Sequence, residues 1–114
     1  MMVLRRKPAV MFKSKNGLLW EPRYLGYRAF LKFVRQLPAC DVQSSRWWFG
    51  DWYINFTYQG TGFRVDTPLS DATLQYPSNV DAAVVQAFER TLREQLGVEI
   101  RPGPPPVSRK QWHL

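Results

Sequence analysis

Residues that carry nucleophilic, acid–base or zinc chemistry are scarce in this sequence of 114 residues, which has one cysteine and one histidine. Tetrahedral zinc sites bring several cysteine or histidine ligands together, so two such residues do not complete one. A nucleophile also needs a base within hydrogen-bond distance, and the only histidine, His113, is the penultimate residue. We therefore expect Cys40 to be a packed thiol, and we predict no metal site, no cofactor and no enzymatic activity.

Long hydrophobic runs are also missing, because no apolar stretch approaches the roughly 20 residues that span a bilayer. The charged residues at the start of the chain are not followed by the apolar stretch of a secretory signal. A single cysteine cannot form an internal disulfide, which is typical of proteins in a reducing compartment. These absences predict a cytoplasmic protein that does not bind a membrane.

Acidic residues are outnumbered, since 9 Asp and Glu stand against 16 Lys and Arg and give a net charge of +7. The excess lies early in the chain: residues 1–46 hold 10 basic and 2 acidic side chains, whereas residues 47–98 hold 3 basic and 6 acidic ones. Such asymmetry is found in polyanion-binding surfaces. It is equally found as solubilising charge and in self-complementary homo-oligomers, so all three interpretations stay open.

Aromatic residues are abundant at 15% of the chain, which is typical of a packed core and not of a disordered chain. The length fits one domain that buries its own core. We predict a basic lead-in at residues 1–8, a single domain at 9–100 and a proline-rich, flexible tail at 101–114.

Hydrophobic periodicity predicts two helices among short strands. In chain order the expected elements are strands at 9–14 and 18–20, a helix at 23–37, a polar connection at 38–45, strands at 46–58, 63–67 and 73–76, and a helix that starts after Ser78 or Asn79 and ends before Gly97. The order ββαββ(β)α predicts an α+β fold, with a small antiparallel sheet of 4–5 strands and two helices packed on one face.

The strongest strand pattern lies at 46–58, with a bulge expected at Gly50. A two-residue type II′ turn at Gly60 and Thr61 would join it to the next strand. This turn fixes a register in which the large apolar residues share one face. The expected partners are Tyr58 with Phe63, Phe56 with Val65, and Ile54 with Thr67.

Alternation along 46–58 also divides its aromatic residues between two faces. Trp48 and Trp52 are expected on the helix-covered face, and Trp47, Phe49 and Tyr53 on the other. Exposed aromatic patches are typical of interaction sites, and Trp and Tyr are common anchors. We therefore predict a non-enzymatic binding protein that uses Trp47, Phe49 and Tyr53 to bind a protein partner or to self-associate as a homodimer. The alternative is that loops, the N-terminal hairpin or the C-terminal tail cover these residues.

A competing hypothesis is nucleic-acid binding through Arg28, Lys32 and Arg35, which recur at i, i+4 and i+7 on the polar side of the first helix. Basic side chains bind phosphates, and nearby aromatic residues stack on single-stranded bases. A third hypothesis is an enzyme that uses the carboxylates of Asp51 and Asp66. It requires a deep pocket that collects Asp51, Asp66 and Arg64, and solvated strand carboxylates are the simpler interpretation.

Overall fold

The computed structural model describes residues 8–14, 17–67 and 71–103. Most of the predicted lead-in, and the predicted tail from residue 104 onward, lie outside the described residues. The elements are β1 (Val10–Ser14), β2 (Gly17–Trp20), α1 (Tyr27–Gln36), β3 (Cys40–Trp48), β4 (Asp51–Tyr58), β5 (Thr61–Asp66), β6 (Ala72–Gln75), α2 (Ala82–Thr91), the π-helical turn η2 (Leu92–Leu96) and β7 (Glu99–Pro102).

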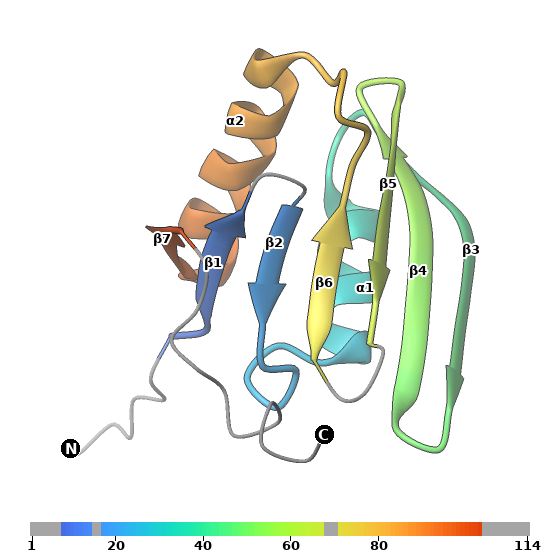
Figure 1. The fold of residues 1–114 in the computed structure, drawn as a ribbon. Helices are drawn as coiled ribbons and strands as arrows, with labels where there is room; N and C mark the ends of the chain where they lie inside the picture. The colour runs from blue at the N-terminus through green and yellow to red at the C-terminus, as the bar shows by residue number, and fades with distance from the viewer. Residues whose placement is uncertain (1–7, 15–16, 68–70, 104–114) are drawn as a thin grey trace, which may run out of the picture.

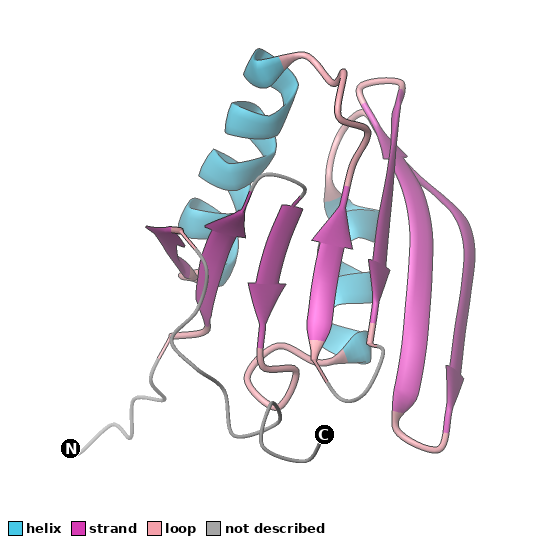
Figure 2. Ribbon diagram, viewed as in Figure 1, coloured by secondary structure: helices cyan, strands magenta, loops and turns pink. Residues whose placement is uncertain are grey.

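One seven-stranded sheet, in the order β3-β4-β5-β6-β2-β1-β7, forms the body of the protein. Its neighbours pair antiparallel except for β1 and β7, which are parallel. Both helices lie on the same side of this sheet (Figure 1). The other side carries no helix in the described part of the chain (Figure 2). The predicted α+β class with one helix-covered face is therefore confirmed, and the sheet has more strands than the predicted 4–5.

The additional strand β3 results from a turn at residues 49–50, where a bulge was predicted. Phe49 and Gly50 adopt positive φ values of 46° and 89°, and the chain reverses there. Positive φ at both central residues is the geometry of a tight hairpin loop. The prediction of one strand over 46–58 is therefore wrong. The predicted polar connection at 38–45 also belongs largely to a strand. Its composition is polar because β3 is an edge strand that buries little of its surface.

The pairing of β4 with β5 differs from the predicted register by two residues. The loop is formed by Gln59 and Gly60, whose φ values are 50° and 80°, and not by Gly60 and Thr61. Phe56 consequently lies opposite Phe63, and Ile54 opposite Val65. Because side chains alternate with a period of two, this shift leaves every side chain on its predicted face.

The helices also differ in detail from the expectation. Residues 22–25 form a separate turn, closed by the Leu25 amide donating to the Pro22 carbonyl (3.2 Å), so α1 begins only after Gly26. Asp81, and not Ser78 or Asn79, caps α2 by accepting a hydrogen bond from the Ala83 amide (2.9 Å). No helix in the described residues combines the length and the apolar character needed to cross a bilayer.

The core fills the space between the sheet and the helices, and its centre is aromatic. Phe88 of α2 lies 5.9 Å from the ring of Phe33 on α1, measured between centroids, and 5.7 Å from Phe56 on β4. Rings from both helices and the sheet therefore meet at one point. The strand residues Trp52, Ile54, Phe56 and Tyr58 are all buried, as their alternation predicted.

Candidate functional site

The open face of the sheet carries a ladder of polar side chains that crosses four strands. Its bonds run from Asn55 Nδ2 to Ser44 Oγ (3.0 Å), from Arg64 Nη1 to Asn55 Oδ1 (2.9 Å), from Arg64 Nε to Asp66 Oδ2 (3.0 Å), from Thr73 Oγ1 to Asp66 Oδ1 (3.3 Å) and from Gln75 Nε2 to Thr73 Oγ1 (3.2 Å). Arg64 therefore has its charge offset by Asp66. The middle of the open face is polar, ordered and nearly neutral.

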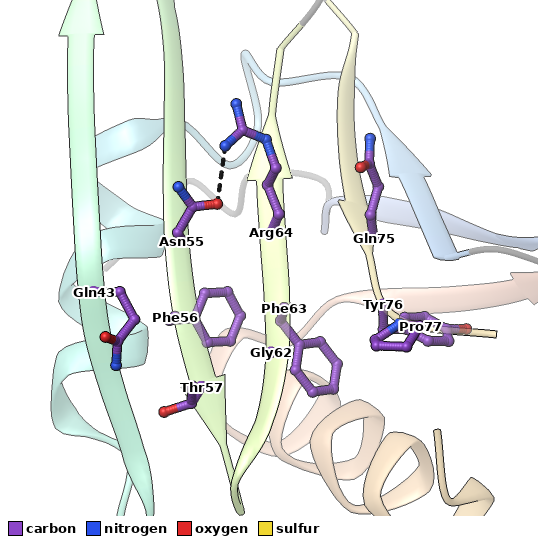
Figure 3. A pocket seen from close by; sticks show the side chains of 10 residues that line it. All are labelled: Gln43, Asn55, Phe56, Thr57, Gly62, Phe63, Arg64, Gln75, Tyr76 and Pro77. Carbon is purple, nitrogen blue, oxygen red and sulfur yellow. Dashed lines mark hydrogen bonds between the residues drawn. The ribbon is translucent and has the colours of Figure 1, made fainter. Parts of the chain in front are cut away.

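A wide hollow of about 450 Å³ lies beside this ladder, over β4 and β5 (Figure 3). Its floor includes Gly62, which pairs with Thr57 and contributes no side chain to fill the space. Figure 3 shows Asn55, Arg64 and Gln75 on three neighbouring strands around it. These groups are amides and an ion-paired guanidinium, so they do not form an acid–base pair.

A smaller hollow of about 200 Å³ brings Asp51, Asp66 and Arg64 together, as the enzyme hypothesis required. Small-molecule pockets usually measure about 300–1,000 Å³. Asp51 is exposed, and Asp66 is engaged by Arg64 and Thr73. The hollow is therefore smaller than the deep pocket that the enzyme hypothesis requires.

The aromatic residues of 47–53 meet at one end of the sheet but do not share a face. Opposed residues on antiparallel strands point to the same side, and Trp47 lies opposite the buried Trp52. Trp47 therefore belongs to the helix-covered side, where it remains 57% exposed. Tyr53 lies on the open face, and Phe49 is in the turn and 97% exposed. The predicted common face for Trp47, Phe49 and Tyr53 is wrong, because the turn at 49–50 inverts the alternation.

Trp48 lies on the open face, where Trp47 was predicted. Its ring lies 6.1 Å from that of Tyr53, edge to face. Arg46 Cζ lies 5.7 Å from the Trp48 ring centre, and Arg64 Cζ lies 4.7 Å from that of Tyr53. These cation–π contacts hold both rings in place. The signal that would have located Trp48 is Gly50, which marks a turn as readily as a bulge.

The basic residues Arg28, Lys32 and Arg35 are exposed on α1, as predicted. None of them forms an ion pair with another residue in 8–14, 17–67 or 71–103. They lie on α1 in the helix layer (Figure 1), whereas the register of β3 with β4 places Trp48 and Tyr53 on the opposite side of the sheet. The structure therefore separates the cationic stripe from the edge-to-face rings of Trp48 and Tyr53 on the open face.

One carboxylate is buried, and its contacts are structural. Glu89 of α2 is 4% exposed, and its Oε1 accepts a hydrogen bond from Lys13 Nζ (3.3 Å). Its Oε2 lies 3.1 Å from the same ammonium without the geometry of a second hydrogen bond. Burial, and then the Glu89 charge, raise the pKa of the Tyr76 hydroxyl. This ion pair ties β1 to α2.

Cys40, at the start of β3, is half-buried, and the pKa of its thiol is raised. Burial first, and then the adjacent charge of Asp41, raise the pKa of its thiol from 9.0 to about 11. A thiol with a raised pKa holds less thiolate at neutral pH, and the thiolate is the reactive form. This agrees with the packed thiol that the sequence predicted.

Alkylation of Cys40 by iodoacetamide is expected to be slow in the native protein. A rise of two pKa units lowers the thiolate fraction about a hundredfold, and the stronger nucleophilicity of a more basic thiolate recovers part of this. At pH 7.5 we expect a rate about ten to a hundred times below that of free cysteine, rising until the pH passes about 11. The urea-unfolded chain is the control and should react like free cysteine. A native rate equal to the unfolded one would contradict the raised pKa.

Comparisons with protein-family models, curated proteins and solved structures found no match to this chain. Among the described residues, no three His, Cys, Asp or Glu side chains gather as a metal-binding group. The class that the structure defines is an α+β protein with one sheet face covered by helices and, among the described residues, one face without a helix. An exposed aromatic cluster stands at the β3–β4 end of that sheet.

Proposed function

We propose that this chain is a non-enzymatic binding protein that recognises a protein partner through the aromatic end of the β3–β4 hairpin. This aromatic end comprises Trp47, Trp48, Phe49 and Tyr53. Its exposure carries the proposal: of the four large hydrophobic residues that are exposed in the described chain, three are Trp47, Trp48 and Phe49. Burial of one such side chain is worth about 1.5–3 kcal/mol, and Trp and Tyr dominate binding hot spots.

The arrangement of the hairpin supports a docking role. β4 is paired on both sides, with β3 and with β5, so the base of the hairpin is held in the sheet. The turn of the hairpin projects past the end of α1 (Figure 1). Arg46 and Arg64 hold the rings of Trp48 and Tyr53, which reduces the entropy that binding has to remove. The partner is either a second copy of this chain or a different protein.

The proposal contains no catalytic step, no metal and no cofactor. It places the protein in the cytoplasm, and the single free thiol of Cys40 supports a reducing compartment. The half-buried position and raised pKa of that thiol also protect it from oxidation, since oxidation follows thiolate character and exposure.

Nucleic-acid binding through Arg28, Lys32 and Arg35 is the second candidate. The exposure of all three without ion pairs in the described chain supports it, and such binding would weaken steeply with salt. It ranks lower because single-strand binding combines phosphate contacts and base stacking on one surface. Here the cations of α1 lie on the opposite side of the sheet from Trp48 and Tyr53, and Trp47 is the one ring of the aromatic end on their side.

The test is a photo-crosslink from the aromatic end in living cells. Phe49 is replaced by benzoylphenylalanine, a change that its 97% exposure makes tolerable, and Gln86 on α2 is replaced in a matched control. We expect a discrete protein adduct from position 49 and none from position 86. Alanine at both Trp47 and Trp48 should reduce the yield about tenfold or more, with the melting temperature checked in parallel.

The adducts also identify the partner class. An adduct of twice the monomer mass supports the proposal with a second copy as partner, and a heavier discrete adduct supports it with a different protein. A nuclease-sensitive adduct would overturn it in favour of nucleic-acid binding. Equal labelling from positions 49 and 86 would also overturn it.

A further inference from the structure

The outer edge of β3 is the longest unpaired strand edge in the described chain. β3 spans Cys40–Trp48 and pairs on one side with β4, and no described strand pairs with its other side. A bulge between Val42 and Ser44 interrupts the ladder, and Ser44–Trp48 then runs in regular register to the turn. An edge strand presents unpaired N–H and C=O groups to which an extended chain can add.

The basic stripe of α1 flanks this edge. Phe33 points toward α2, where its ring lies 5.9 Å from Phe88, whereas Tyr27 Oη lies 3.0 Å from Ser45 Oγ on β3. The helix therefore turns one flank to α2 and the other to β3. Arg35 is on the β3 flank, because it lines a hollow of about 460 Å³ with residues 40–45. Arg28 lies two helical turns away on the same stripe, next to Tyr27.

The charges around the edge are mostly positive. Arg28, Lys32 and Arg35 are unpaired within the described chain, and Arg46 is exposed on the open-face side of β3. Asp41 is the single acidic residue of β3. A second copy of β3 at this edge would bring two basic α1 helices together, and like charges would oppose the pairing. Charge complementarity therefore favours an acidic occupant.

We propose that the outer edge of β3 accepts an extended acidic segment of a partner protein as an additional strand. The segment pairs with Ser44–Trp48, and its carboxylates face Arg28 and Arg35 on the helix side and Arg46 on the open side. This inference rests on the proposed function, because it places the partner chain beside Trp47 and Trp48. It adds the chemistry of the partner and its mode of binding.

The experiment titrates the whole chain with a short capped peptide of alternating glutamate and valine, followed in amide NMR spectra at low salt. We expect saturable shifts of the Ser44–Trp48 amides. An analogue N-methylated on every residue cannot donate the ladder hydrogen bonds from either edge, so it should bind about tenfold or more weakly. A lysine–valine peptide should not bind.

The matched variants are Arg28→Glu with Arg35→Glu, and Arg90→Glu with Arg93→Glu. The two pairs change the net charge equally, and Arg90 and Arg93 are exposed on α2 and η2, away from β3. Only the first pair of substitutions should weaken binding of the glutamate–valine peptide, by about tenfold or more. Equal weakening by both pairs would show that only overall charge attracts the peptide, and would overturn strand addition.

Three other results would overturn the inference. The first is the absence of saturable shifts, and the second is equal affinity of the N-methylated analogue. The third is tighter binding of oligothymidylate with shifts of the same β3 amides. This third result would assign the edge to nucleic acid. If a protein adduct forms at position 49 but any of these results is obtained, the proposed function is retained and the addition of an acidic strand is rejected. Peptide binding at β3 without an adduct at position 49 removes the proposed function instead.

Discussion

Replacement of Phe88 by alanine is expected to lower the free energy of unfolding by about 3–5 kcal/mol. The Phe88 ring is 1% exposed, and it is the side chain at which α1, α2 and the sheet meet. Its centroid lies within 6 Å of the rings of Phe33, Phe56, Tyr58 and Phe63. Alanine removes the buried ring and leaves a cavity that these rings, held by their own neighbours, cannot close.

Urea denaturation followed by circular dichroism measures this loss. Phe49→Ala is the matched control, because it makes the same chemical change at a side chain that is 97% exposed, and it should alter the unfolding free energy by less than about 0.5 kcal/mol. Domains of this size are stable by about 5–15 kcal/mol, so Phe88→Ala should consume a large part of the total. Similar losses in the two variants would contradict the assigned core.

Gly17→Ala is expected to destabilise the protein by about 3 kcal/mol or more, through backbone strain and lost strand pairing. Gly17 is buried at the start of β2 with φ of +150°, a region that L side chains rarely adopt. A Cβ at this position would overlap the backbone carbonyl of Leu74 on β6. The β2–β6 pairing joins β1, β2 and β7 to the other four strands, so the clash opens the sheet at its centre.

Thermal and urea unfolding measure the effect, and hydrogen exchange locates it. The amides around Leu74 and Gln75 should lose protection in the Gly17 variant. Gly62→Ala is the control, since a Cβ there meets nothing within 4 Å and φ lies outside the positive region. Its unfolding free energy should change by less than about 1 kcal/mol. An equal loss in the two glycine variants would refute the close approach of β2 and β6.

Much of the candidate surface depended on features that local sequence does not encode. The stripe of Arg28, Lys32 and Arg35 followed from helical spacing alone, and the structure confirms that these residues are exposed on one helix. Its position beside an unpaired strand edge did not follow, because a polar edge strand such as β3 has the composition of a loop. The aromatic cluster was found in sequence, but its division between faces was not.

That division depended on one local choice at Phe49 and Gly50. A glycine between two aromatic runs is compatible with a bulge, which continues the strand, and with a turn, which reverses it. With a bulge, residues 46–48 would continue the strand of residues 51–58, whereas with a turn they pair beside it. Packing against α1 and β5 decides between these two arrangements. The turn moves Trp48 to the open face and Trp47 to the helix side.

The sequence by itself determined the α+β class, the two one-sided helices and the buried face of 52–58, because each depends on periodicity within a single segment. Only the tertiary structure decided that the described strands form one seven-stranded sheet, that β7 joins β1 in parallel, and that no described strand pairs with the edge of β3 that the basic helix flanks. These features arise from pairings between segments far apart in the chain. Such pairings are selected by the burial of the whole core, and no local pattern records them.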